Sequence, residues 1–365
     1  MSPHSDSGPI RGRGTDERPT GRFERLHYEP CEDADDVDPN IPGEQRRPSP
    51  PTELYRDDSR SILAYNDSPD VGFEVSINPY RGCEHGCVYC YARPTHEYLG
   101  LSAGLDFETK IFVKEKAPEM LRRELASPRW KPCVIALSGV TDPYQPAERS
   151  LRLTRRCLET LLEFRNPVAI ITKSRLVTRD VDILRELARF DAAAVFVSVT
   201  TLRPELQRVL EPRAASPSTR LAAIETLSQA GVPVGVLVAP VLPALNDHEI
   251  PAILQAAARS GAREAGYVLL RLPHGLAPLF EDWLGHHFPD RKEKVLARIR
   301  DLRGGRLNDP RFGARMRGEG PFAEQIRGLF DVACRNAGLG RKQLNLSTSH
   351  FRNPAGRQLT LFDDA

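Results

Sequence analysis

Three cysteines lie close together in the segment 76–93, SINPYRGCEHGCVYCYAR. Cys83, Cys87 and Cys90 form a C-x₃-C-x₂-C array, and Tyr89 directly precedes the last cysteine. Thiolates are the usual ligands of iron–sulfur clusters, which normally take four of them. Because this loop supplies only three, it predicts a [4Fe–4S] cluster whose remaining iron is open to a ligand from outside the protein.

A zinc site is the alternative for the same cysteines. Zinc normally takes four protein ligands in structural sites, so His85 or His96 would have to complete it. Zinc motifs usually contain a second cysteine pair, and the other cysteines are scattered at positions 31, 133, 157 and 334. The sequence therefore favours the cluster and predicts no auxiliary cluster, with Gly82 and Gly86 letting the loop approach it closely.

The elements that must position this loop alternate along the chain between strand-like and helix-like patterns. Short apolar runs, typical of parallel strands covered on both faces, occur at 73–78, 133–138, 168–172, 194–200, 232–239 and 266–272. Helical patterns lie between them at 114–126, 148–165, 178–190, 217–230 and 247–260. This order predicts an α/β fold, a partial (β/α)6 TIM-like barrel, with a doubly wound open sheet as the alternative.

The cysteine array with its preceding aromatic residue resembles the signature of radical S-adenosylmethionine (SAM) enzymes. The stretches SINPYRGCEHGCVYCYARPTHEY, SGVTDPYQPAE and LVAPVLPALND resemble the branch related to spore photoproduct lyase, and the resemblance covers about 75–275. It implies the radical SAM barrel, a [4Fe–4S] cluster and SAM as cofactors. Enzymes of this kind cleave SAM reductively to a 5′-deoxyadenosyl radical, which abstracts hydrogen from the substrate.

The resemblance also places the SAM contacts on residues that follow four successive strands. These residues are Ser138, Thr141, Asp142, Lys173, Ser198, Thr200 and Ala239. Asp142 would accept the SAM ammonium group and Lys173 would pair with the carboxylate, while the later strand ends would contact ribose and adenine. Each residue also has an ordinary interpretation as a turn, a solvated charge or a hydroxyl bonded to the backbone.

One departure from spore photoproduct lyase concerns the reaction. That enzyme returns a hydrogen atom from a cysteine near its second strand end, where this chain has Ala136, Leu137 and Ser138. Tyr89 and Tyr91 match aromatic positions of the lyase and are the candidate catalytic residues, either packing on the cluster or relaying hydrogen. Repair of the spore photoproduct itself is therefore not expected.

The flanking segments differ from this core in composition. Residues 1–60 are rich in Pro, Gly, Ser, Arg and Asp and predict a disordered tail, followed by the radical SAM core at 61–275. Residues 276–340 predict a helical extension, with helices at 276–303 and 321–337. Residues 341–365 predict a flexible tail.

That C-terminal tail contains QLTLF, which resembles the pentapeptide by which bacterial repair and replication proteins bind the DNA sliding clamp. Gln358, Leu359, Leu361 and Phe362 would make the contacts. The alternative is that the tail folds back on its own domain. With the clamp interpretation, arginines of the 303–320 break are candidate phosphate contacts: Arg303, Arg306, Arg311, Arg315 and Arg317. The same arginines are equally consistent with a solvated loop.

Composition gives the remaining bounds. The net charge is only +2, so nucleic acid would have to be met by a local patch. The chain shows neither a long apolar run nor a signal-peptide pattern, and clustered cysteines fit a reducing compartment, so we expect a cytoplasmic protein.

We expect a lyase-like radical SAM enzyme acting on nucleic acid in DNA repair, with flavodoxin or ferredoxin as electron donor. The alternatives are a radical SAM enzyme for a protein or small molecule, and a non-catalytic iron–sulfur adaptor on the clamp.

Overall fold

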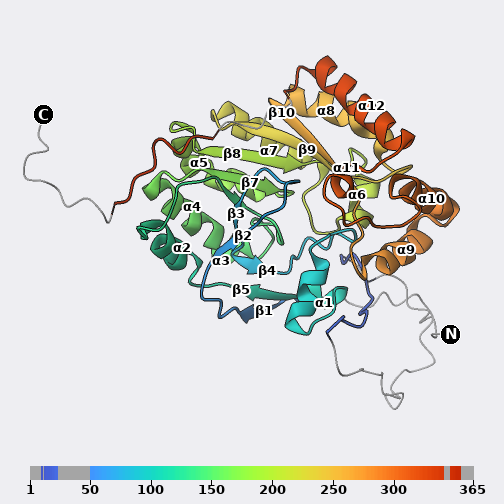
Figure 1. Ribbon diagram of the computed structural model, residues 1–365, viewed down its shortest axis with the longest axis horizontal. Coiled ribbons are helices and arrows are strands. Elements are labelled where there is room, and N and C mark those ends of the chain that lie inside the picture. The colour runs from blue at the N-terminus through green and yellow to red at the C-terminus, as the bar shows by residue number, and fades with distance from the viewer. Residues whose placement is uncertain (1–9, 11, 24–49, 341–345, 355–365) are drawn as a thin grey trace, which may run out of the picture.

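A seven-stranded sheet forms the centre of the computed structural model, which describes residues 10, 12–23, 50–340 and 346–354 (Figure 1). The strand order is β10-β9-β8-β7-β6-β3-β2, and every neighbouring pair is parallel except β2 with β3. The strands are β2 (Leu63–Tyr65), β3 (Val75–Ile77), β6 (Ile135–Leu137), β7 (Val168–Thr172), β8 (Ala193–Ser198), β9 (Val234–Val241) and β10 (Glu264–Leu269). Six parallel strands thus follow one another in chain order, as predicted, in an open barrel.

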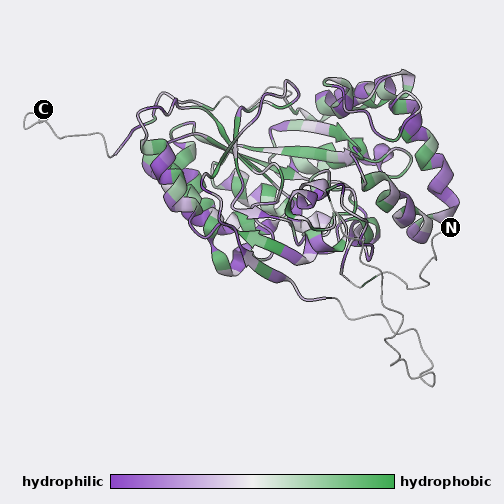
Figure 2. Ribbon diagram, turned by 60° about the horizontal axis from the view of Figure 1, so that its bottom comes forward, coloured by the Kyte–Doolittle hydropathy of each residue, from purple (hydrophilic) through white to green (hydrophobic). Residues whose placement is uncertain are grey.

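These strands form where β-branched and apolar residues occur in short uninterrupted runs. Val195, Val197, Val234 and Val236 are all buried, because the sheet is covered on both faces. The strands are accordingly the apolar centre of the molecule, whereas the outward faces of the helices are polar (Figure 2). Burial of this kind is the main favourable contribution to folding.

Helices connect the parallel strands, as the sequence predicted. They are α2 (Ala117–Ala126), α3 (Glu148–Leu151), α4 (Leu153–Phe164), α5 (Val181–Ala188), α6 (Pro204–Leu210), α7 (Pro217–Gln229) and α8 (Ile250–Arg259). The start of α7 shows the local cause, since Ser216 caps it by accepting a hydrogen bond from the Thr219 amide and Pro217 occupies the first turn. The 148–165 pattern is divided into α3 and α4 at Arg152, which has a φ of 52°. Helix α6 was not predicted.

A second, smaller sheet was not predicted from the sequence. It consists of β1 (Glu53–Arg56), β5 (Lys110–Val113) and β4 (Tyr80–Arg81), in the order β1-β5-β4. The 3-10 helix η1 (Arg93–Leu99) and helix α1 (Leu105–Thr109) lie between β4 and β5 in the chain. The cysteine loop is the segment that joins β4 to η1, so this small sheet fixes one of its ends.

The helical extension is confirmed, with α9 (Leu276–His287), α10 (Lys292–Leu302) and α12 (Pro321–Ala337). A short helix, α11 (Ala314–Arg317), lies within the predicted break. Phe280 and Trp283 of α9 pack with their rings 5.5 Å apart in a second apolar cluster, to which Tyr89 also belongs. In the described part of the chain, no helix combines the length and apolar character needed to cross a membrane.

Both terminal segments are more ordered than predicted wherever the structure describes them. Residues 12–23 lie between α1 and α9 (Figure 1), and the Leu105 amide donates to the Glu17 carbonyl at 2.9 Å. Near the other end, the Arg352 amide donates to the Phe164 carbonyl at 2.9 Å. The prediction of tails at 1–60 and 341–365 therefore fails for 12–23, 50–60 and 346–354, while the QLTLF residues lie outside the described part.

Candidate active site

The three cysteines lie on one tight loop whose glycines are required by protein contacts. Cys83 and Cys87 are 7% and 8% exposed, and Cys90 is partly buried. Gly82 has a φ of 82°, and a Cβ there would lie 2.8 Å from Cε1 of His96. Gly86 has a φ of 67°, and a Cβ there would lie 2.6 Å from Oε2 of Glu108. The glycines thus let the loop pack against η1 and α1, besides any approach to a cluster.

The three cysteine sulfurs do not converge as the ligands of a single zinc ion would. Three thiolates at about 2.3 Å from one ion would lie about 3.8 Å apart. Within the described residues, the three cysteine sulfurs are not among the groups whose ligand atoms all lie within 4.8 Å of one another. Nor is His96 a fourth ligand of such an ion, since its Nε2 lies 2.9 Å from the Lys110 carbonyl and its ring packs against Phe107.

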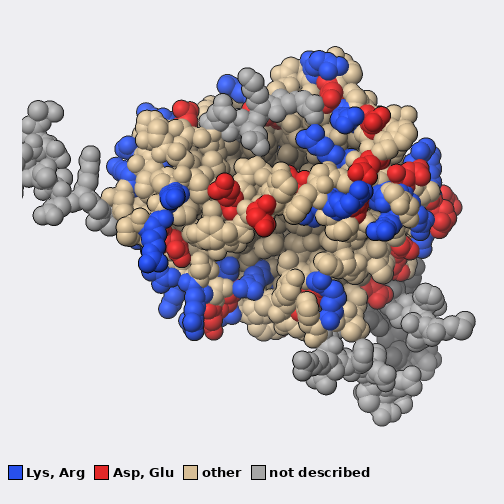
Figure 3. Space-filling model, viewed as in Figure 1, with Lys and Arg blue, Asp and Glu red and all other residues tan. Residues whose placement is uncertain are grey.

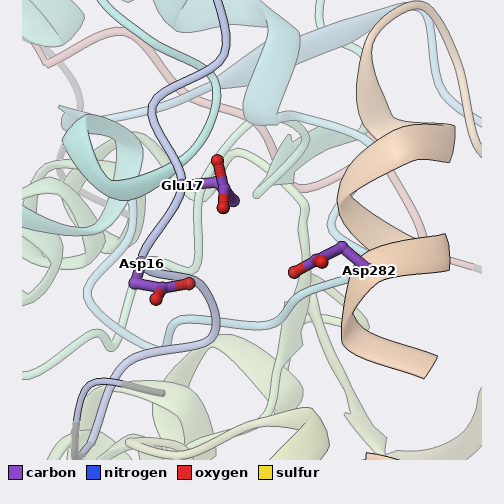
Figure 4. A group of neighbouring side chains, drawn as sticks. All are labelled: Asp16, Glu17 and Asp282. Carbon is purple, nitrogen blue, oxygen red and sulfur yellow. The ribbon is translucent and has the colours of Figure 1, made fainter. Parts of the chain in front are cut away.

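One set of three acidic side chains does lie close enough together to share a metal ion. Asp16 and Glu17 of the N-terminal segment and Asp282 of α9 bring their oxygens within 4.8 Å (Figure 4). Glu17 is exposed and the other two are partly exposed. Exposed acidic groups are common without a bound ion, so we assign no metal to them.

The loop after β6 holds the start of the cysteine loop through its side chains. The Thr141 hydroxyl donates to the Gly82 carbonyl at 2.7 Å, and Nε2 of Gln145 donates to the same oxygen at 3.3 Å. In return, the Glu84 amide donates to Oε1 of Gln145 at 3.0 Å. Thr141 therefore fixes the backbone next to Cys83, whatever it contributes to SAM.

A fully buried arginine holds the middle of the same loop. Nε of Arg93 donates to the Cys87 carbonyl at 2.9 Å, and its Nη2 pairs with Oε1 of Glu108 at 2.5 Å. The other oxygen of Glu108 accepts from the Gly14 amide at 3.0 Å. A Cβ on Gly14 would lie 1.8 Å from the Gly86 carbonyl. The N-terminal segment is therefore packed directly against the cysteine loop.

Asp142 is surrounded by partners from the protein. Its Oδ1 accepts from the Tyr144 amide at 2.8 Å and from the Thr172 hydroxyl at 2.7 Å, and its Oδ2 accepts from the Lys173 amide at 2.7 Å. Nδ1 of His85 lies 3.4 Å from Oδ2. Burial opposes ionisation, but His85 and these bonds together lower the pKa of Asp142. Its role as the SAM ammonium acceptor stays a prediction, and its contacts give it a structural role.

A second buried network joins Tyr89 to the ends of β7, β8 and β9. Nζ of Lys173 donates to the Ala239 carbonyl at 3.2 Å and lies 3.9 Å from Oε1 of Glu211. Glu211 accepts from Tyr89, from Thr200 at 2.6 Å and from Arg220. Burial opposes its charge, but Arg220 and Lys173 outweigh burial and lower the pKa of Glu211 to about 2. The network thus holds a permanent carboxylate.

The two tyrosines predicted as catalytic lie in different surroundings. Tyr89 is 7% exposed and its hydroxyl is committed to Glu211, whereas Tyr91 is 47% exposed. The Tyr91 hydroxyl donates to the Gly139 carbonyl after β6, and its ring centroid lies 5.2 Å from the Arg271 guanidinium carbon. Only Tyr91 therefore offers a face to a molecule at the open end of the sheet.

The structure gathers the predicted SAM residues at the carboxyl ends of the strands, but in separate groups. Lys173, Thr200 and Ala239 share the network with Tyr89. Ser138 instead donates to the Thr141 carbonyl at 3.2 Å. Ser198 is buried, and its carbonyl accepts from Arg220 at 3.0 Å. No local sequence pattern indicates the contact of Ser198 with Arg220, because the two residues are far apart in the chain.

Several supporting residues were not found from the sequence. They are Arg93, Glu108, Gln145, Glu211 and Arg220. As polar residues within helical or loop patterns they resemble ordinary surface positions, although charged residues are rarely buried unless they are paired. Glu211 directly follows α6, which was not predicted, and nothing in the local sequence indicates that its side chain points inward.

A profile described as "Radical SAM superfamily" matches residues 77–257. An uncharacterised protein of Mycobacterium tuberculosis (strain ATCC 25618 / H37Rv) is 37% identical over 244 residues, which are 66% of this chain and 71% of that protein. An uncharacterised protein of Methanocaldococcus jannaschii is 30% identical over 184 residues, covering 50% of this chain and 66% of that protein.

Solved structures of spore photoproduct lyase share the fold. The complex with dinucleoside spore photoproduct aligns with a TM-score of 0.56 and 16% identity, covering 78% of this chain and 80% of the lyase. A variant with bound AdoMet and the same dinucleoside aligns with a TM-score of 0.57 and 16% identity, covering 80% and 82%. At this identity the likeness concerns the fold.

Proposed function

This chain belongs to the radical SAM superfamily, and we propose that it is a radical SAM enzyme that acts on nucleic acid. Its cofactors are a [4Fe–4S] cluster and SAM. When bound, these cofactors supply a 5′-deoxyadenosyl radical for hydrogen abstraction. The observation that carries the proposal is the convergence of Cys83, Cys87 and Cys90 with the Lys173 network at the carboxyl ends of the parallel strands.

Different residues of this chain would hold the cluster and SAM. The three cysteines would ligate the cluster, while Arg93 and Thr141 fix the carbonyls of the loop that carries them. Lys173 is a partly buried cation next to the loop, 5.9 Å from the Tyr89 ring, and would pair with the SAM carboxylate. The burial of Cys83 and Cys87 would limit the access of water and oxidants to the bound cluster.

Three features support nucleic acid as the substrate class. The solved lyases that share this fold bind a dinucleoside photoproduct. The exposed Tyr91 at the open end of the sheet provides a surface on which a base could stack. The QLTLF sequence at 358–362 would recruit the enzyme to the sliding clamp. A reductant of the flavodoxin or ferredoxin class completes the proposed set of partners, in the reducing cytoplasm.

The reaction proposed is not cleavage of the spore photoproduct. Cys133 precedes β6 and so lies at the opposite end of this strand from Ser138, and its thiol is not placed among the strand-end residues. A hydrogen atom would therefore have to return to the product from another donor, and Tyr91 is the exposed hydroxyl beside the loop. DNA repair with a lyase-like step remains the proposal, on a substrate other than that photoproduct.

Anaerobic reconstitution tests the proposal. The protein should bind about four irons, absorb near 400 nm and release 5′-deoxyadenosine from SAM when reduced with dithionite. Cys90→Ala should abolish both properties, while Cys133→Ala serves as the matched control. Stimulation of 5′-deoxyadenosine release by damaged oligonucleotides, and not by peptides, would support the substrate class. A colourless protein with stoichiometric zinc would refute the enzyme.

A further inference from the structure

Arg271 is a half-buried cation at the open end of the sheet that lacks a counter-charge. It lies two residues after the end of β10. Within the described residues, no carboxylate lies within the 4.0 Å of an ion pair with it, and its one hydrogen bond goes from Nη1 to the Met316 sulfur at 3.5 Å. A thioether is a weak acceptor, so the five N–H donors of the guanidinium remain largely unused.

The neighbouring arginines differ from Arg271 in this respect. Arg315 pairs with Asp70 and also donates to Ser68. Arg303 donates to the Leu270 carbonyl at 2.7 Å and to the Ala314 carbonyl at 2.6 Å. Both were predicted as phosphate contacts, but the protein itself satisfies them. Their charges add to the positive potential at Arg271, and basic side chains gather around α11 on this face, with acidic ones interspersed (Figure 3).

The electrostatic surroundings of Arg271 would be relieved by an anion. Burial, and next the charge of Arg315, lower the pKa of Arg271, while Tyr91 and Asp70 act in the opposite direction. Asp70 is already bound by Arg315 and by the Gly313 amide at 2.6 Å. A half-buried charge without a partner lowers the stability of the fold. Such groups therefore occur mainly where function requires them. The free donors of Arg271 therefore indicate a ligand that carries negative oxygens.

The position of Arg271 indicates which molecule supplies those oxygens. Its guanidinium carbon lies 5.2 Å from the ring centroid of Tyr91, the residue directly after Cys90. Lys173, the cation expected for the SAM carboxylate, directly follows β7 and belongs to the network of Glu211. It lies near the ring of Tyr89, the residue before Cys90. Arg271 and Tyr91 are partly open to solvent, as a substrate site must be.

We propose that Arg271 binds a phosphate group of the substrate, with the adjacent Tyr91 ring as the platform for a base. The proposal rests on the proposed function and names the residue by which the enzyme holds a nucleic acid. A planar guanidinium binds two phosphate oxygens at once, which a lysine does not, so Arg271 would also fix the orientation of the strand. The base on Tyr91 would then lie next to the cluster loop.

Binding by the reconstituted holoenzyme tests this site. The probes are a fluorescent single-stranded 12-mer, inorganic pyrophosphate and SAM, measured for wild type, Arg271→Gln and Arg271→Lys. Arg185→Gln is the control, because Arg185 is an exposed arginine of α5, 86 residues before Arg271 in the sequence. Arg271→Gln should weaken 12-mer binding about tenfold and reduce the salt slope by about one, with Arg271→Lys intermediate.

The outcomes separate the site from the proposed function. The site would be overturned if Arg271→Gln bound both phosphate probes as tightly as the Arg185→Gln control does. It would also be overturned if Arg271→Gln lost affinity for SAM, since the anion bound by Arg271 would then be the SAM carboxylate. Pyrophosphate binding that depends on Arg271 without any 12-mer binding by wild type would support a phosphate site and refute nucleic acid as substrate. Failure of wild type to bind either phosphate probe would overturn both.

Discussion

Nδ1 of His85 lies 3.4 Å from Oδ2 of Asp142, and the His85 side chain is buried next to Cys83 while that of Asp142 is only 10% exposed. Burial opposes the charge on His85, but Asp142 and Cys83 raise its pKa to about 10. The loop after β6 thus places a carboxylate, and through it an imidazolium, beside Cys83, one of the three proposed cluster ligands. This arrangement gives Asp142 a function in the loop that does not depend on SAM.

Asp142→Asn should therefore lower the stability of the cysteine loop and leave the affinity for SAM largely unchanged. An amide presents N–H groups where Asp142 accepts from the Lys173 amide, so we expect a loss of about 2 kcal/mol in unfolding free energy and a lower iron content. Urea unfolding and iron analysis measure these effects, and Thr172→Val, which removes one of the same bonds, is the control. An unchanged midpoint with tenfold weaker SAM binding would assign Asp142 to SAM instead.

Lys173→Met should have the opposite profile. Methionine keeps an unbranched apolar side chain, one atom shorter than lysine, but removes the charge expected to pair with the SAM carboxylate, so the Kd for SAM should rise about tenfold. Because Glu211 also keeps Arg220 as its partner, the fold should be retained. Equilibrium dialysis with SAM measures the effect, and an unchanged Kd would leave Lys173 a partner of Glu211 alone.

Arg93→Met should lower the free energy of unfolding more than any substitution at the strand ends does. The substitution leaves Glu108 charged, fully buried and without its partner, and frees the Cys87 carbonyl. Breaking such a pair costs about 3–5 kcal/mol. Urea denaturation should show this loss, and the double variant Arg93→Met with Glu108→Met should recover part of it. A double variant no more stable than Arg93→Met would mean that the carbonyl contacts dominate.

The fold was predicted from the sequence where a local pattern determines burial, and the site was not predicted where distant contacts determine it. Val168–Thr172 and Ala193–Ser198 are continuous apolar runs, so their strands could be recognised. Arg93 and Glu108 are buried only because α1 folds back on the cysteine loop. Likewise, the composition of residues 12–23 is that of a disordered segment, and packing against Gly86 orders them.

Gly14→Ala tests this unexpected packing. The new Cβ would lie 1.8 Å from the Gly86 carbonyl, so the N-terminal segment must separate from the loop. Hydrogen exchange should then increase in residues 82–92, and the reconstituted cluster should decay faster in air. Gly275→Ala is the matched control, since a Cβ at Gly275 meets nothing within 4 Å. Equal exchange in the two variants would show that the segment does not protect the loop.

His96 should make stability depend on pH between about 6.5 and 4. Burial is the main reason that its pKa falls to about 4, so the folded protein keeps it neutral while the unfolded chain takes up a proton. Its contribution is fully present above the unfolded pKa and is lost as the pH falls toward 4, by at most about 3 kcal/mol. His96→Phe keeps the ring between Phe107 and Phe112 but cannot titrate, so its urea midpoint should change less between pH 7 and pH 5 than that of wild type. His248→Gln, at an exposed histidine, should keep the wild-type dependence. If His96→Phe followed the wild-type curve, other groups would have to account for the acid sensitivity.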